Sequence, residues 1–408
     1  MQTLLGWRAL LAGAPRRALL VAPSGLPTRP RLSLRCTDLP SPLPQCAASA
    51  RRVKGMSQDT LSDVLRSVRL RSAVFFFVSG EGDWVAEAPA SREIADAVMP
   101  DAEHVIEYHV VTGGECWAAI TGEQPRKLKH GDIILLPQGD AHVVSSAPGM
   151  RANPGVDKYF ELQRNQRPFR IHYSSGAVPV SLERDSAASS AFGASSDATT
   201  LVCGFIGIDA RPFNPLLATL PRLLHLPGGG DRSQQLAQLA AEESARKRPG
   251  AEALLERLSE MMFVDAIRRH VEQLPDQSTG WLAGLRDRFV GRALALLHDR
   301  PSAEWTVEEL AKQVGLSRSA FHDRFVELIG QPPMQYLTQW RMQAASRLLR
   351  DTQASVASVA LDVGYDSEAA FARAFKRAAG VPPAAWRRQH SGHDRMATPA
   401  QLEPPVRG

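Results

Sequence analysis

The sequence predicts a multidomain protein in which an all-β barrel precedes an all-α domain with two helix-turn-helix units. Short apolar runs separated by Gly, Pro and acidic residues extend from Phe75 to about Asp209, and they are typical of a barrel or a sandwich. Helical periodicity begins near Ser233 and continues to Arg388. Within this helical region one pattern of residues occurs twice at a fixed offset, which indicates two copies of one structural unit.

These patterns divide the 408-residue chain into five segments. A basic extension occupies 1–55, the β-rich domain is expected at 56–230, and a helical linker or dimerisation region follows at 231–280. The helix-turn-helix domain is expected at 281–390, and residues 391–408 are predicted to be a disordered tail. The hydrophobic content of 44% is ordinary for globular domains with apolar cores.

The basic extension accounts for the positive charge of the chain. It holds nine Lys and Arg against one acid, a net charge of +8, so the remaining residues carry −3 of the total of +5. A transit peptide, a signal peptide and a start codon assigned too early are the three interpretations. We favour the third, with Met56 as the true start, because MSQDTLSDVLRSVRL begins a polar-capped amphipathic helix, expected at 57–70.

Cysteine usage and hydropathy favour a cytoplasmic protein. Cys36 and Cys46 lie in the extension, Cys116 and Cys203 lie in the body of the chain, and no CxxC pair occurs. This is not a disulfide framework, and it fits a reducing compartment. No run of 18 apolar residues occurs, so we expect no membrane-spanning helix and no membrane partner.

Six apolar runs are expected to form strands of the barrel. They read FFFVSG, HVIEYHVVTGG, CWAAITG, DIILLPQG, HVVSS and TTLVCGFIGI. RDSAASSAFGASSDAT, at 184–199, interrupts them, and its Ser, Ala and Gly content predicts a mobile surface loop. The segment at 212–227 is expected to return the chain through short turns.

A long helix is predicted between the two domains, in AEALLERLSEMMFVDAIRRHVEQL. Its broad apolar stripe includes Leu254, Leu258, Met261, Met262 and Ile267. The stripe fits packing within the protein or a contact between two subunits, and the pattern alone does not separate these interpretations. DQSTG, at 276–280, is expected to be a linker before the C-terminal helices.

The C-terminal repeat is the most specific pattern in the sequence. Phe321, Phe325, Gly330, Pro332 and Pro333 recur 50 residues later as Phe371, Phe375, Gly380, Pro382 and Pro383. In each copy a short helix (TVEELAKQV; SVASVALDV) leads through a glycine-containing turn to a second helix (RSAFHDRFVELIG; EAAFARAFKRAAG). Glycine permits the left-handed backbone of a short turn, and a serine can cap each second helix.

The repeat predicts two helix-turn-helix units that bind double-stranded DNA. The apolar face of each second helix packs on the first helix, so its polar face is free to enter a major groove. The candidate DNA-binding residues are Arg318, Ser319, His322 and Asp323 in the first copy and Glu368, Ala369, Arg373, Lys376 and Arg377 in the second. Ser317 and Ser367 are the expected caps.

The segment PMQYLTQWRMQAASRLLRDT predicts a rigid connection between the two units. A helix of about 17 residues spans about 25 Å, which would hold the two reading helices near one turn of DNA apart. Arg341, Arg347 and Arg350 on this helix are expected near phosphates. The region 281–390 has 15 Lys and Arg against 11 acids, a modest excess that suits contacts to the DNA backbone.

This region resembles the DNA-binding domain of the AraC/XylS family over residues 284–388. The resemblance is strongest in VALDVGYDSEAAFARAFKRAAGVPPAAWR. It implies that Ser319, His322 and Asp323 read bases in the first copy, and that Glu368, Ala369 and Arg373 do so in the second. Arg373 is the strongest candidate, because a guanidinium can pair bidentately with guanine. Glu368 and Ala369 are less usual at these positions.

The stretch HGDIILLPQGDAH resembles the second cupin motif. Gly131, Pro137, Gly139 and His142 keep its spacing. In the first motif His109 occupies the first histidine position, Glu115 the carboxylate position and Gly122 the glycine position, whereas Val111 replaces the second histidine. The resemblance therefore leaves His109, Glu115 and His142 as possible metal ligands. Because Val111 removes one ligand, we expect no bound metal and no other cofactor.

A cupin-like barrel, a helical dimer region and two helix-turn-helix units are the organisation of AraC-type regulators, so the barrel implies a sensor domain. We expect it to sense a small molecule or an oxidant, with His109, Glu115, Cys116, His142 and Cys203 as candidate residues. Both cysteines also fit buried apolar positions, and no Lys, Arg or His flanks either one.

The resulting hypothesis is a DNA-binding transcriptional regulator without catalytic residues. It is expected to act as a homodimer and to have RNA polymerase as a further partner. The alternative is a metal-dependent cupin enzyme fused to a DNA-binding domain, for which His142 would be an essential ligand.

Overall fold

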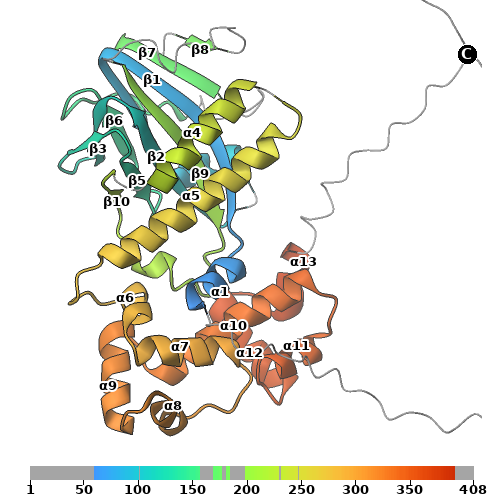
Figure 1. Ribbon diagram of the computed structural model, residues 1–408. Coiled ribbons are helices and arrows are strands. Elements are labelled where there is room, and N and C mark those ends of the chain that lie inside the picture. Colours follow the sequence, from blue (N-terminus) through green and yellow to red (C-terminus); the bar gives the residue numbers. More distant parts are fainter. Residues whose placement is uncertain are drawn as a thin grey trace, which may run out of the picture. The chain divides into compact units, whose positions relative to one another are not determined.

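The computed structural model describes residues 59–100, 102–156, 169–176, 181–183, 198–228, 231–246 and 248–390. The predictions for 1–55, for most of the loop at 184–199 and for the tail at 391–408 lie outside these residues. Within the described ranges a curled, mostly antiparallel β-sheet comes first and helices follow, as the sequence predicts (Figure 1). No helix in these ranges is long and apolar enough to span a membrane.

All six predicted runs are strands. The described strands are β1 (Arg71–Ala88), β2 (His104–Gly113), β3 (Glu115–Ile120), β4 (Arg126–Lys129), β5 (Ile133–Leu136), β6 (His142–Ser145), β7 (Phe169–Gly176), β8 (Ser181–Glu183), β9 (Thr199–Ile208) and β10 (Leu224–Leu226). Their order is β10-β5-β2-β9-β1-β6-β3-β4, with β7 pairing with β1 and β8. β1 is long enough to join two parts of the sheet, because its first half pairs with β9 and its last residues pair with β6.

Four of these strands and one helix were not expected from the sequence. β4 reads RKLK and buries a single apolar side chain, so it lacks a clear hydrophobic period. β10 lies in a segment that we expected to form short turns, and it pairs with β5. α2 (Ser91–Val98) lies between β1 and β2 and buries Ile94 and Val98 against the barrel interior. α1 (Thr60–Ser67) ends earlier than the helix expected at 57–70, because Val68 is its C-cap and Arg69 has a left-handed φ of 46°.

Alternation along β2 gives the sheet two apolar faces. Val105 and Val111 belong to the cluster that fills the barrel interior, whereas Ile106, Tyr108 and Val110 belong to the cluster on the outer face. Successive side chains of a strand point to opposite faces, so this division follows from the period of two. Residues at odd positions of β2 therefore face the interior.

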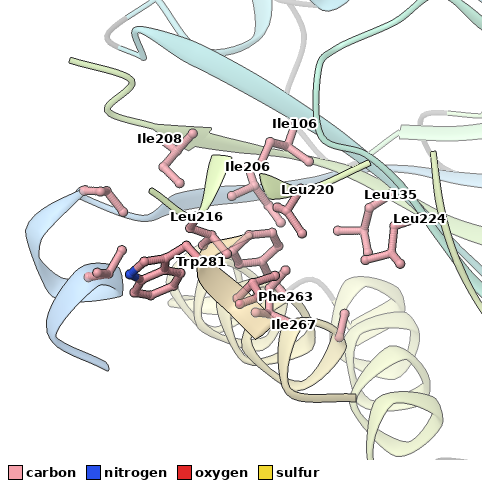
Figure 2. Packing of buried hydrophobic residues seen from close by; sticks show 14 of the residues in the cluster. Ile106, Leu135, Ile206, Ile208, Leu216, Leu220, Leu224, Phe263, Ile267 and Trp281 are labelled. Atoms are coloured by element: carbon pink, nitrogen blue, oxygen red, sulfur yellow. The ribbon is translucent and has the colours of Figure 1, made fainter. Parts of the chain in front are cut away.

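Two long helices cover the outer face of the sheet. They are α4 (Asp231–Arg246) and α5 (Ala251–Gln273), and Figure 2 shows Phe263 and Ile267 of α5 facing Ile106 and Ile206 of the sheet. The Ser259 hydroxyl lies 2.7 Å from the Tyr108 hydroxyl. Packing within the protein thus accounts for part of the apolar stripe of α5.

The remainder of the stripe is exposed. Leu254 has a relative exposure of 46% and Met261 of 52%. These two residues are seven positions apart, so they lie on the same side of the helix.

The C-terminal helices form two compact cores. They are α6 (Trp281–Arg286), α7 (Val290–Asp299), α8 (Val307–Val314), α9 (Arg318–Ile329), α10 (Pro333–Asp351), α11 (Val356–Asp362), α12 (Glu368–Ala379) and α13 (Pro383–His390). Phe321 and Phe325 join the cluster on the outer face of the sheet, whereas Phe371 and Phe375 lie in a separate cluster.

Candidate functional site

The first helix-turn-helix unit consists of α8 and α9. Gly315 ends α8 with a φ of 82°, a left-handed conformation that favours glycine. The Ser317 side chain then accepts a hydrogen bond from the backbone N–H of Ala320 and caps α9. Phe321 and Phe325 are fully buried, so α9 is held on one face and its opposite face is open.

The second unit, α11 and α12, repeats this construction. Gly364 has a φ of 81°, and a Cβ there would lie 2.9 Å from an Arg341 nitrogen and from the Ser302 backbone. The Ser367 side chain caps α12 by accepting a hydrogen bond from the Ala370 N–H. Both predicted serine caps are therefore present in the structure.

The candidate DNA-binding side chains lie on the open faces of α9 and α12. The exposed residues are Arg318, Ser319, Asp323, Glu368, Ala369, Arg373, Lys376 and Arg377, and His322 is partly exposed. Arg318 forms an ion pair with Glu308 at 2.8 Å, and His322 Nδ1 lies 3.3 Å from Asp323 Oδ1. Such exposed pairs are weak and can exchange for phosphate or base contacts.

α10 connects the two units and has 19 residues, which corresponds to about 28 Å. The expectation that Arg341 and Arg350 lie near phosphates is wrong. Arg341 donates hydrogen bonds to the carbonyl oxygens of Pro301, Ala303 and Gly364, so it joins the two units. Arg350 is buried and pairs with Asp209 of the β-domain.

Arg347 is the one of these three arginines with an exposed side chain, at 49%. Among the described residues its partner is Asp351, with which it forms an ion pair at 3.6 Å. A guanidinium must be accessible to solvent to contact a phosphate, so of the three arginines Arg347 alone keeps this predicted role.

Inside the barrel, Glu107, His109 and His142 meet. One ligand atom from each lies within 4.8 Å of the others, and all three side chains are buried. Glu107 and His109 share the inward face of β2, and His142 begins β6 on the opposite part of the sheet. The two imidazole Nε2 atoms are 2.7 Å apart.

The hydrogen bonds of this cluster fix its neutral tautomers. His142 Nδ1 lies 3.1 Å from the carbonyl oxygen of Asp140 and must donate to it, so His142 Nε2 is an acceptor. His109 Nε2–H therefore donates to His142, and His109 Nδ1 accepts from the Cys203 thiol at 2.9 Å. The chain of donors runs from Cys203 through both histidines to Asp140.

Burial keeps every member of the cluster uncharged at neutral pH. It raises the pKa of Glu107 to about 8. It lowers the pKa of His142 to about 4, although the Asp140 carbonyl opposes this shift, and it holds the pKa of His109 well below its usual range. The approach of His142 Nε2 to Glu107 Oε1, at 3.8 Å, is therefore not a salt bridge.

Comparison with known proteins covers both parts of the chain. Residues 59–272 match the Cupin family, and residues 310–389 match the helix-turn-helix domain family. An AraC-like transcription regulator described for Streptomyces lividans is 33% identical over 334 residues, which are 81% of this chain and 98% of the relative. The chain belongs to the AraC family of transcriptional regulators.

Two further similarities are to other regulators of transcription. The HTH-type transcriptional regulator AlkR of Acinetobacter baylyi is 29% identical over 81% of this chain and 99% of its own length. The DNA-binding domain of AdpA, solved in complex with a target DNA, is 32% identical and matches 27% of this chain and 99% of that domain, with a TM-score of 0.25. The two family matches and the relatives that span most of the chain show that this AraC-family protein is a DNA-binding regulator with an N-terminal cupin domain.

The cluster inside the cupin domain of this regulator differs in one residue from the set of ligands predicted from the sequence. Glu115 does not lie with His109 and His142, because it begins β3 on the exposed side and pairs with Lys127 at 2.5 Å. Glu107 takes its place. The sequence contained a signal for this, since residues two apart in a strand share a face and Glu107 precedes His109 by two.

The other predicted sensor residues are inside the barrel. Cys116 and Cys203 are free and buried in the interior cluster, and Val111 is there as expected. Burial raises the pKa of the Cys116 thiol to about 12 and raises that of Cys203 well above its usual range. Both are therefore thiols at neutral pH, whereas oxidant-sensing cysteines are usually thiolates.

Proposed function

We propose that this AraC-family regulator binds a small-molecule effector through its cupin domain and thereby changes how α9 and α12 are presented to DNA. The observation that carries the proposal is the attachment of α10 to the β-domain. Gln343 of α10 donates to the Ser67 carbonyl and accepts from the Phe213 N–H, and Arg350 pairs with Asp209. A shift of the β-domain would move the helix that joins the two reading units.

Effector binding is tested by thermal melting of the full chain with candidate small molecules. A ligand that binds the folded state alone raises the melting temperature in a concentration-dependent way. If the barrel has only a structural role, a small molecule that changes promoter output should leave the melting temperature of the protein unchanged. We further propose that the protein acts in the cytoplasm, where its DNA is, and without catalysis.

Substitution of the two cysteines tests whether the signal is a small-molecule effector or an oxidant. Their thiols are buried and have raised pKa values, so we expect the double variant Cys116→Ser, Cys203→Ser to keep its response in a promoter assay. Loss of an oxidant response in that variant, with DNA binding intact, would identify a redox sensor instead.

We propose Arg373 as the residue with the largest effect on base recognition, supported by its exposure on α12. Arg373→Ala is expected to weaken specific operator binding by about 1–3 kcal/mol, because one bidentate contact to guanine is lost. Arg388→Ala is the matched control, since it removes the same charge from an exposed position on α13. An unchanged footprint for Arg373→Ala would exclude this role.

We also propose that the regulator is a homodimer that contacts RNA polymerase from its operator. The exposed Leu254 and Met261 of α5 are the apolar side chains that support a subunit contact. Substitution of both by Glu should shift sedimentation toward the monomer and leave the melting temperature nearly unchanged.

A further inference from the structure

Both histidines of the barrel cluster present the same nitrogen atom to one point. His109 Nε2 and His142 Nε2 are 2.7 Å apart, while each Nδ1 is occupied by an outer partner, Cys203 Sγ and the Asp140 carbonyl respectively. Histidines that bind a metal through Nε2 almost always have Nδ1 held by a neighbouring polar group in this way. The arrangement thus contains both an inner set of donors and the outer contacts that orient them.

Glu107 adds a carboxyl group with an oxygen atom that forms no hydrogen bond to any described residue. Its side chain is only 3% exposed, and its Oε2 atom has no hydrogen-bond partner among the described residues. A buried polar atom without a partner is costly, and a bound ion that supplies the missing contact is one explanation for it. Its other oxygen, Oε1, lies 3.8 Å from His142 Nε2.

We propose that Glu107, His109 and His142 bind one divalent first-row transition-metal ion inside the barrel. Two imidazole nitrogens and one carboxylate are donors that suit Zn²⁺, Fe²⁺ and related ions, and three protein ligands leave positions open for water or an effector. Metal binding replaces the hydrogen bond between the two Nε2 atoms and gives the orphaned carboxyl oxygen a partner. Once His109 Nε2 is a ligand, its Nδ1–H donates to Cys203 Sγ.

The proposed ligand set departs from the spacing of the cupin motif. That motif places the carboxylate at Glu115, which is 56% exposed and paired with Lys127. The carboxylate of the proposed site instead comes from the residue two positions before His109 on the same strand. If the proposed set is right, substitution of Glu107 weakens metal binding and substitution of Glu115 does not. If the motif spacing is right, the reverse holds.

The strands that carry the site also reach the helices. Tyr108, between Glu107 and His109, contacts Ser259 of α5 through hydroxyl groups 2.7 Å apart. β9 carries Cys203, and Asp209, which directly follows that strand, pairs with Arg350 of α10. A change at the metal can therefore move both α5 and α10. The proposal that a metal binds here does not rest on the proposed response to an effector.

The test uses the full-length protein, stripped of metal with a chelator and titrated with Zn²⁺ by calorimetry. We expect one ion to bind per chain, and Co²⁺ to give a visible absorption band at the same stoichiometry. Glu107→Gln keeps the shape of the side chain and removes the anionic ligand, so it should weaken Zn²⁺ binding more than about 100-fold. His142→Ala should abolish the Co²⁺ band.

Glu115→Gln is the matched control, and it should bind Zn²⁺ like the unsubstituted protein. Glu107→Gln removes an unpaired buried carboxyl, so it should fold at least as well, and circular dichroism with thermal melting checks this. If His142→Ala does not fold, Glu107→Gln still decides the question. Equal Zn²⁺ binding by Glu107→Gln and the parent, or no stoichiometric binding by the parent, would overturn the proposal.

Discussion

The two helix-turn-helix units share one sequence pattern but differ in how they join the rest of the protein. Phe321 and Phe325 of the first unit belong to an apolar cluster that continues through Trp281 to the outer face of the β-sheet (Figure 2). Phe371 and Phe375 of the second unit belong to a separate cluster. Among the described residues, Asp209 of the β-domain pairs with Arg350 at the end of α10, and Glu103 pairs with His390 of α13.

A repeated local pattern therefore sets the fold of each unit but not how the unit is attached to the rest of the protein. Apolar surfaces separate only at a large cost in exposed area, whereas polar contacts can be replaced by contacts with water at a small net cost. The second unit is therefore the one that we expect to move relative to the β-domain. A regulator can use this asymmetry to alter the spacing of its two reading helices.

The largest expected effect comes from paired truncations of the two cores. Phe325→Ala and Phe375→Ala should each reduce the free energy of unfolding by about 3–5 kcal/mol, because each opens a cavity in a buried core. Phe325→Ala should also speed amide hydrogen exchange in α5, whereas the faster exchange in Phe375→Ala should stay within α10, α11, α12 and α13, whose residues share its cluster. The same pattern of exchange in both variants would contradict the comparison.

The next effect comes from the buried ion pair at the end of α10. Arg350→Ala leaves Asp209 without its partner, and burial already raises the pKa of Asp209 to about 6 despite the arginine. We expect a loss of about 3 kcal/mol in chemical denaturation. Arg347→Ala, on the same helix and paired only with Asp351 on the surface, is the control and should cost less than about 0.5 kcal/mol.

The smallest effect is a pH dependence at His390 of α13. A hydrogen bond that His390 donates to Glu103 raises the pKa of His390, and the neighbouring Asp209 adds to the shift. Burial alone would raise the pKa of Glu103, but hydrogen bonds from His390 and the Arg211 N–H outweigh it and lower that pKa. The nearby carbonyl of Trp386 accepts from His390 Nδ1 at 2.8 Å.

The direction of the pH dependence follows from the pKa shifts of His390 and Glu103. The contribution of His390 is complete below its ordinary pKa of 6.5 and is lost as pH rises through the raised value, while that of Glu103 is lost only in acid, below its ordinary pKa of 4.5. Hydrogen exchange in α13 should therefore be less protected at pH 8 than at pH 6, beyond the intrinsic pH dependence of exchange. His390→Asn should remove that excess, and an unchanged excess would exclude this contact as its source.

Much of the helical domain could be predicted from the sequence, because its determinants are local. Ser317 and Ser367 cap helices through backbone groups three residues away. The period of the phenylalanines defines the buried face of each second helix. The six strands were predictable for the same reason, since each carries its own apolar run.

The rest could not be predicted, because it depends on partners far along the chain. Arg350 was assigned to phosphate from its charge, but its partner Asp209 is 141 residues away and comes near only when the two domains pack. Glu115 was assigned to the cluster from motif spacing, but its position in β3 points it to Lys127.

The two kinds of domain can be read from the sequence alone, and so can the capped recognition helices and the histidines of the barrel. Periodicity and capping act within a few residues, so they are readable without the fold. The folded chain alone shows that Glu107 joins His109 and His142, and that Arg350 ties the end of α10 to the β-domain. Strand pairing and domain packing place these groups together, and both are properties of the whole chain.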